Sequence, residues 1–193
     1  PVTIVEFSDY ECPFCERFVT QTLGQLDDNY ISQGKAKLIF RDYPLPFHAN
    51  AKGMAVAAEC ARNQGGDDTY FKLHDLIFKN RNTMDATAMK AHAKTLGLDE
   101  TKFDTCLTNG DLDDEITQDM ADGQSAGISG TPGFLVLMKK TKSGAETLKG
   151  MELVQQGQYI IQYIETEDGA RMGLRISGAH PYSTFEKAIE VGL

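Results

Sequence analysis

The sequence predicts an α/β fold into which an all-helical segment is inserted. Three observations support this prediction. A short apolar strand, a helix and a second strand follow one another within residues 2–42, which is the beginning of a parallel α/β unit. Residues 49–126 then show helical spacing of apolar side chains and no convincing strand. An apolar strand returns at residues 134–138.

The first strand, residues 2–8, is apolar and β-branched, which is typical of a strand buried on both faces. Pro13 suits the first turn of the helix that follows, because its missing N–H costs nothing there. The remaining elements are expected as a helix at 16–26, a strand at 37–42, helices at 50–64, 69–80, 85–96, 100–108 and 111–125, a strand at 134–138, two or three strands within 141–177, and an amphipathic helix at 182–191.

Composition restricts the function classes. The 193 residues suffice for about one domain, and 19 basic against 28 acidic side chains give a net charge of −9. This acidity argues against binding to nucleic acid or anionic membranes, which need a basic surface. No apolar run approaches the roughly 20 residues that span a bilayer, so we expect no membrane insertion. Because the chain enters a strand directly after Pro1, we expect a processed or trimmed form.

The strongest chemical signal is the pair Cys12 and Cys15, separated by Pro13 and Phe14. The first cysteine of such a pair lies where unpaired N–H groups and the helix dipole favour a thiolate. The second lies one turn further on, close enough to form a disulfide with the first. A Cys-x-x-Cys between a strand and a helix is therefore typical of thiol–disulfide exchange, which needs an activated thiol and a resolving thiol.

Two other interpretations of this pair compete. A zinc site would need a second pair of ligands at close spacing, which the other two cysteines and the four histidines do not offer, so we expect no metal site and no cofactor. A structural disulfide is also conceivable, but so tight a loop at the tip of a helix favours thiol–disulfide exchange over a purely structural cross-link. We interpret His48, which precedes a predicted helix, as a local cap.

Several motifs together resemble a known family. These are Val5–Cys15, Ser129-Gly130-Thr131-Pro132 and Ile176–Tyr182, with the helical insertion between the first two. Their order and spacing are similar to those of DsbA-like thiol:disulfide oxidoreductases. The resemblance implies a thioredoxin fold formed by residues 1–48 plus 127–193, with residues 49–126 as an inserted helical domain. It also implies export to the periplasm or cell envelope, thiol-containing protein substrates and a membrane redox partner.

The resemblance assigns roles to individual residues. Cys12 would be the exposed nucleophile and Cys15 the buried resolving thiol. Thr131-Pro132 matches the family's cis-proline loop, which lies against the dithiol and pairs with substrate backbone; the alternative is an ordinary trans proline in a turn. Glu6 matches a buried acid that relays a proton to the second cysteine. Its alternative is an exposed charge on an edge strand.

The resemblance also bears on Cys60 and Cys106. Both follow apolar positions on predicted helices, and related sequences often pair cysteines in these contexts, which implies a buried structural disulfide. Two buried free thiols are the alternative, since cysteine is often a small buried apolar residue.

The sequence departs from the family pattern in two places. Phe14 stands where the strong oxidants carry histidine, so it offers the thiolate neither charge nor a hydrogen bond. Residues 139–175 exceed the usual short hairpin and predict an extra strand pair.

We therefore expect an enzyme that exchanges disulfides with exported protein thiols through Cys12 and Cys15, as an oxidant, with Phe14, Thr131 and Pro132 in contact with substrate. A disulfide isomerase or reductase is the alternative within the enzyme class. A non-catalytic thioredoxin-like binding module or a metal chaperone is the alternative from a different class.

Overall fold

A computed structural model describes residues 1–193, apart from the side chain of Tyr159. Its core is a six-stranded sheet in the order β2-β1-β3-β6-β5-β4. The strands are β1 (Val2–Ser8), β2 (Ala36–Asp42), β3 (Gly133–Lys139), β4 (Leu153–Gln155), β5 (Gln158–Glu165) and β6 (Arg171–Ser177). β1 and β2 are parallel, whereas the other neighbouring pairs are antiparallel. The predicted parallel strand–helix–strand unit is thus confirmed.

One continuous helical segment connects β1 to β2, and a second helix closes the chain. The segment consists of α1 (Pro13–Phe18), the π-helical turns η1 (Val19–Leu23) and η2 (Asp27–Ile31), and α2 (Gly24–Leu26) between them, and the closing helix is α8 (Tyr182–Glu190). Phe18, Phe134 and Phe185 join both helices to β3, with ring centroids 4.5–5.3 Å apart. Such aromatic pairs add about 0.5–1.5 kcal/mol each beyond their buried area. They fix α1, and with it Cys15, on the sheet.

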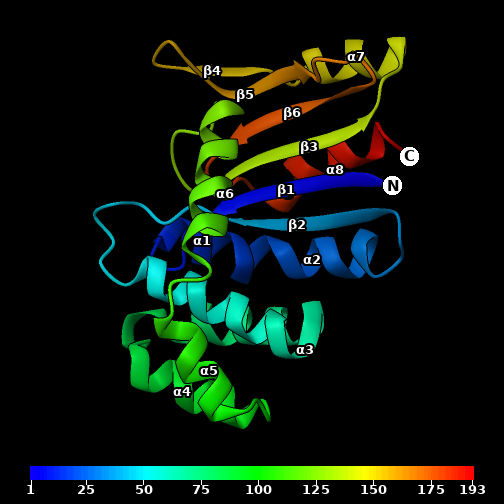
Figure 1. The fold of residues 1–193 in the computed structure, drawn as a ribbon. Helices are drawn as coiled ribbons and strands as arrows, with labels where there is room; N and C mark the ends of the chain where they lie inside the picture. Colours follow the sequence, from blue (N-terminus) through cyan, green and yellow to red (C-terminus); the bar gives the residue numbers. More distant parts are fainter.

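The helices between β2 and β3 form a block beyond the β2 edge of the sheet, and Figure 1 shows α3, α4 and α5 packed together there while α6 runs across the strands. They are α3 (Ala51–Asn80), the short η3 (Arg81–Thr83), α4 (Ala86–Thr95), α5 (Glu100–Thr108) and α6 (Asp113–Ser125). α1, α2 and α8 cover the sheet face that carries Val2 and Ile4. α6 packs near Phe7 on the opposite face. The predicted α/β class with a helical insertion is confirmed, whereas its division into two domains stays a prediction.

One of two predicted features is confirmed and the other needs correction. The helices expected at 50–64 and 69–80 are present as the two halves of α3, which meet at a kink at Gly66, where a φ of 70° is a left-handed conformation that favours glycine. Within residues 141–177 the sequence predicts two or three strands, but Lys142–Lys149 forms the helix α7. Its start is capped by Thr141, whose hydroxyl accepts a hydrogen bond from the Gly144 N–H at 3.1 Å. The predicted extra strand pair is present as β4 and β5.

Candidate functional site

Cys12 and Cys15 lie at the start of α1, directly after the carboxyl end of β1. Cys12 occupies the N-cap position with an extended backbone, and Pro13 is the first helical residue. The Cys12 N–H donates to the Asp9 carbonyl at 3.1 Å, which closes the turn between the strand and the helix. Cys15 follows one helical turn later, its thiol contacts that of Cys12, and both are free.

The expectation that Cys12 is exposed is wrong. Cys12 keeps only 4% of its surface accessible and Cys15 keeps 0%, whereas Phe14 between them is 54% exposed. Cys12 is covered because it packs against the loop at Thr131, where its Sγ lies 3.4 Å from the Thr131 carbonyl oxygen. The exposed Phe14 ring and the loop at Thr131 thus flank the Cys12 sulfur.

The two thiols have opposite electrostatic environments. The neighbouring Cys15 thiol, the Thr131 hydroxyl and the N–H groups of Cys15 and Phe14 stabilise a Cys12 thiolate and lower the pKa of Cys12 to about 5. Burial, together with the nearby Cys12, raises the pKa of Cys15 well above its ordinary value. At neutral pH the reduced site therefore holds a thiolate at Cys12 and a neutral thiol at Cys15.

The peptide bond between Thr131 and Pro132 is cis. The Pro132 carbonyl accepts a hydrogen bond from the Gly178 N–H at 2.8 Å, which ties the loop to the segment after β6. The Thr131 hydroxyl is buried and forms no hydrogen bond of ordinary length and angle at rest, so its O–H is available to the Cys12 thiolate. Whether Thr131 and Pro132 contact substrate stays a prediction.

Glu6 lies in β1 with 0% exposure. β1 is flanked on both sides, and Glu6 is paired in register with Phe40 of β2 and Phe134 of β3. The alternative of an exposed charge on an edge strand is therefore wrong. Burial raises the pKa of Glu6 to about 8, and contact with Ser8 opposes this shift. Glu6 is thus mostly protonated at neutral pH.

The loop before Cys12 is held by the connection between β2 and α3 and by η3, which the sequence did not predict. Asp9 accepts a hydrogen bond from the Leu45 N–H at 2.6 Å, its Oδ2 lies 2.8 Å from Nδ1 of His48, and it accepts locally from the Glu11 N–H at 2.7 Å. Arg81 donates to the Glu11 carbonyl at 3.1 Å. The contacts with Leu45, His48 and Arg81 join residues 36 to 70 apart in the sequence, so no local pattern could indicate them.

The interpretation of His48 as a local cap is wrong, because its ring pairs with Asp9. Glu11 caps the start of α3, because its carboxylate accepts hydrogen bonds from the N–H groups of Asn50 and Ala51 at 2.6 and 2.9 Å. A carboxylate at this place compensates the positive end of the helix dipole. The Cys12 loop and the helical block thus stabilise each other.

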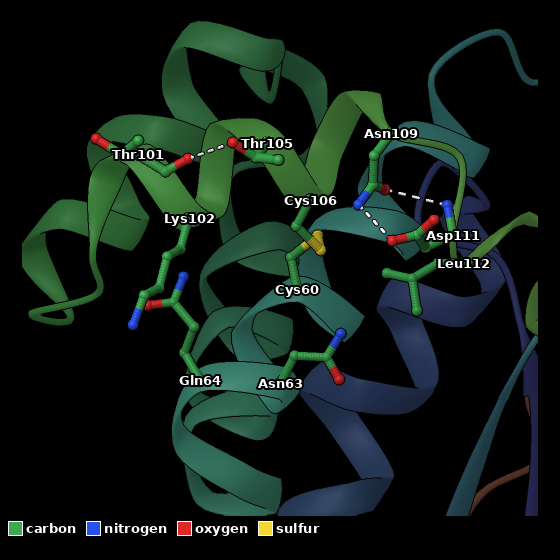
Figure 2. Close-up of a pocket in the computed structure, with 10 residues that line it drawn as sticks. All are labelled: Cys60, Asn63, Gln64, Thr101, Lys102, Thr105, Cys106, Asn109, Asp111 and Leu112. Carbon is green, nitrogen blue, oxygen red and sulfur yellow. Dashed lines mark hydrogen bonds between the residues drawn. A yellow bond between two sulfur atoms is a disulfide. The ribbon is translucent and has the colours of Figure 1, made fainter.

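Cys60 of α3 and Cys106 of α5 form a disulfide that joins two positions 46 residues apart in the sequence. Figure 2 shows it at the base of a cavity of about 350 Å³, lined also by Asn63, Thr105 and Asn109. Cys60 is fully buried, but Cys106 is only half-buried because it faces this cavity, so the expectation that both are buried is wrong for Cys106.

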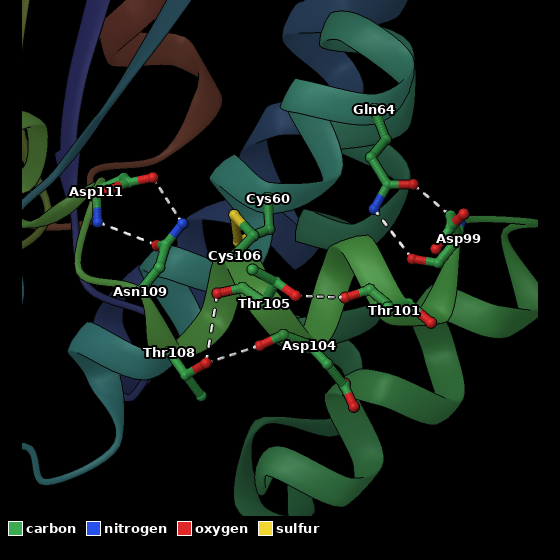
Figure 3. Close-up of a disulfide and its surroundings, with 10 residues drawn as sticks. All are labelled: Cys60, Gln64, Asp99, Thr101, Asp104, Thr105, Cys106, Thr108, Asn109 and Asp111. Carbon is green, nitrogen blue, oxygen red and sulfur yellow. Dashed lines mark hydrogen bonds between the residues drawn. A yellow bond between two sulfur atoms is a disulfide. The ribbon is translucent and has the colours of Figure 1, made fainter.

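A second contact joins the same two helical regions. Gln64 of α3 accepts from the Asp99 N–H at 2.9 Å and donates to the Asp99 carbonyl at 3.3 Å (Figure 3). Asp99 also caps the start of α5. The disulfide and this amide pair thus fix α5 on α3 from two positions.

Among the described residues, no group of three or more His, Cys, Asp or Glu side chains is placed to hold a metal ion. No helix in the described part of the chain is both long and apolar enough to cross a membrane.

Comparison with known proteins places this geometry in a family. The family model described as "Thioredoxin" matches residues 1–152. The chain belongs to the thioredoxin family. Its fold is that of DsbA proteins: the crystal structure of Wolbachia pipientis alpha-DsbA1 matches with a TM-score of 0.72 at 19% identity, covering 100% of this chain and 85% of the other. The resemblance to DsbA-like proteins that the sequence indicated, and the thioredoxin fold, are confirmed.

Curated relatives of this thioredoxin-family chain carry two kinds of name. "Na(+)/H(+) antiporter NhaA 3" of Salinispora tropica is 31% identical over 137 residues, which is 70% of this chain and 20% of the antiporter. "Probable disulfide bond formation protein D" of Bacillus cereus is 27% identical over 143 residues, covering 70% of this chain and 65% of the relative. The chain therefore spans one fifth of the first relative and about two thirds of the second.

Proposed function

We propose that this chain is a thiol:disulfide oxidoreductase that oxidises protein thiols through Cys12 and Cys15. The observation that carries this proposal is the asymmetry of the two thiols, with a stabilised thiolate at Cys12 and a buried, neutral Cys15. A stabilised thiolate favours the reduced form of the site, and an enzyme whose reduced form is stabilised is an oxidant. The name of the Bacillus cereus relative supports the same reaction class.

The reaction begins from the Cys12–Cys15 disulfide. A substrate thiolate attacks Cys12 Sγ, a mixed disulfide forms, and Cys15 leaves as a thiolate that must gain a proton. A second substrate thiolate then attacks the substrate sulfur of the mixed disulfide, so that the substrate disulfide forms and Cys12 leaves as a thiolate. The two electrons lost by the substrate remain on Cys12 and Cys15.

Residues around the dithiol support these steps. Glu6 is protonated at neutral pH and buried, so it can supply the proton that Cys15 needs as it leaves. The backbone at Thr131-Pro132 lies against Cys12 and offers an edge along which an extended substrate can bind. The exposed Phe14 ring provides an apolar contact beside the attacked sulfur.

The setting of the reaction is part of the proposal. The Cys60–Cys106 disulfide suits an oxidising compartment, which supports export to the periplasm or cell envelope, where thiol-containing exported proteins would be the substrates. Each turnover leaves the site reduced, so an electron acceptor has to restore the disulfide. We assign this step to a membrane redox partner.

The test is oxidative refolding of a reduced, denatured disulfide protein by the purified oxidised chain, with Cys12→Ser as the control. We expect wild type to form disulfides in the substrate in stoichiometric amounts and Cys12→Ser to form none. A reduction potential as low as that of thioredoxin, with rapid reduction of insulin, would indicate a reductase instead. No activity above the Cys12→Ser control in either direction would indicate a non-catalytic binding module.

A further inference from the structure

Buried polar atoms without partners gather beneath the dithiol. Buried polar side-chain atoms are normally hydrogen-bonded, so each exception needs a physical reason. Among the described residues, seven side-chain nitrogen or oxygen atoms are buried without a partner, and four of them surround the two thiols: both carboxyl oxygens of Glu6, the hydroxyl of Ser8 and the hydroxyl of Thr131. Because these atoms gather at one site, we infer that they form hydrogen bonds during the reaction that are absent from the resting dithiol.

Ser8 lies between Glu6 and Cys15. Glu6 and Ser8 are two residues apart on β1, so their side chains project from the same face of the strand. The Asp9 N–H lies 3.5 Å from Cys15 Sγ, which places the Cys15 thiol beside the end of β1. Ser8 is 1% exposed, and Glu6 and Cys15 are each 0% exposed, so bulk water does not reach the three side chains.

Ser8 is the neighbour that both groups share. Interaction with the Ser8 hydroxyl lowers the pKa of Glu6 and also that of Cys15, although burial raises both. The Ser8 oxygen forms no hydrogen bond of ordinary length and angle in the dithiol state. Hydrogen bonds that serve catalysis are often long or bent at rest and tighten during the reaction.

We propose that the Ser8 hydroxyl carries the proton between Glu6 and Cys15, a role that rests on the proposed disulfide exchange. When a thiolate attacks Cys12 Sγ and the Cys12–Cys15 bond breaks, the electron pair stays on Cys15 Sγ. The Ser8 O–H gives its proton to this sulfur, and the Ser8 oxygen accepts the proton of the Glu6 carboxyl. Cys15 thus becomes a neutral thiol, Ser8 is restored and Glu6 is left as a carboxylate.

A hydroxyl fits this role because it both donates and accepts. Asp9, the carboxylate next to Ser8 in the sequence, is occupied by the Glu11 and Leu45 N–H groups and by His48. The Asp9 N–H at Cys15 can stabilise the departing thiolate, but an amide does not give up its proton. Ser8 is therefore the group beside Cys15 that can pass on a proton from Glu6.

The test follows the opening of the Cys12–Cys15 disulfide by reduced glutathione, with acid quenching, alkylation and mass spectrometry. Ser8→Ala should open at least about 10-fold more slowly, since a positioned proton donor contributes roughly 10²–10⁴-fold. Once the rate is divided by the fraction of glutathione present as thiolate, wild type should slow as pH rises through the Glu6 pKa of about 8, and Ser8→Ala should lose this dependence. Ser8→Thr, which keeps a hydroxyl, should restore most of the rate.

Thr3→Val is the matched control, since it removes another buried hydroxyl of β1 far from the dithiol, and it should open like wild type. Equal rates and equal pH profiles in Ser8→Ala and wild type would overturn the proposal. Should Ser8→Ala fail to fold, the solvent isotope effect of wild type decides: a clear slowing in D₂O is expected, and none would refute proton transfer in this step. Because glutathione replaces the protein substrate, failure of oxidative refolding would count against the proposed function alone.

Discussion

Removing the Cys60–Cys106 disulfide should destabilise the protein by several kcal/mol. The bond closes a sequence separation of 46 residues, and the chain-entropy relation gives about 4 kcal/mol at 25 °C for a loop of this length. For a chain of this size, 1 kcal/mol corresponds to roughly 2–4 °C in Tm, so Cys60→Ala combined with Cys106→Ala should melt about 8–16 °C below wild type. Alanine is preferred to serine because Cys60 is fully buried and a hydroxyl there would lack a partner.

The assay is equilibrium urea unfolding of wild type and the double variant, both without reductant. The denaturant dependence of unfolding should be steeper for the variant, because its unfolded chain is less constrained and exposes more surface. Thr105→Ala is a suitable control, since it alters the same cavity wall without touching the cross-link, and it should change stability by no more than about 0.5 kcal/mol.

The reasoning would be refuted by a stability loss below about 1 kcal/mol with an unchanged denaturant dependence. Alkylation of Cys60 and Cys106 in native, unreduced protein would also contradict it, because bonded sulfurs do not react. Mild reductant should expose Cys12 and Cys15 to alkylation first. The second step of their reduction releases Cys12 as a stabilised thiolate, whereas the Cys60–Cys106 bond offers no leaving thiolate with such stabilisation.

Three further variants test the charges around the site. Phe14→His should lower the pKa of Cys12 by about 1 and make the protein more oxidising, because an imidazolium stabilises the thiolate; an unchanged pH profile of alkylation would refute this. Glu6→Gln should slow stopped-flow exchange at Cys15 by on the order of 100-fold with little change in fold, whereas lost Tm with unaltered exchange would mark Glu6 as structural. Asp42→Asn should stabilise the protein more at pH 7 than at pH 4 in urea unfolding. Burial and the nearby Glu59 and Asp119 raise the pKa of Asp42 well above 3.8, so wild type loses stability as pH rises above 3.8. An equal effect of Asp42→Asn at both pH values would contradict this assignment.

The strands and the dithiol could be predicted because their signals are local. An apolar run of seven residues, a Cys-x-x-Cys and a proline at the first helical position each act on neighbouring backbone. The burial of Glu6 was implied by the resemblance, and it agrees with the expectation that the strand at residues 2–8 is buried on both faces. The helix α7 was missed because it has only eight residues, of which Ala145 and Leu148 are the apolar ones, and its Thr141 cap is a single side-chain contact.

The surroundings of the dithiol could not be predicted, because they come from distant segments. The packing of Thr131 on Cys12 joins residues 119 apart, and it is this contact that covers a thiol expected to be exposed. Arg81 reaches the Glu11 carbonyl across 70 residues. The half-burial of Cys106 depends on how α5 rests on α3, and no periodicity within either helix encodes that geometry.

The direction of exchange depends on groups other than the residue between the cysteines. In the strong oxidants that this chain resembles, a histidine stands at the position of Phe14, and an uncharged ring removes that contribution. Yet the pKa of Cys12 is still lowered, because the Cys15 thiol, the Thr131 hydroxyl and the N–H groups at the start of α1 stabilise its thiolate. A protonated Glu6 favours the same direction, since it can neutralise Cys15 as it leaves but cannot deprotonate it. The backbone, the loop at Thr131 and the buried acid therefore support the proposed oxidation of substrates, and we propose that Phe14 adjusts its strength and contacts the substrate.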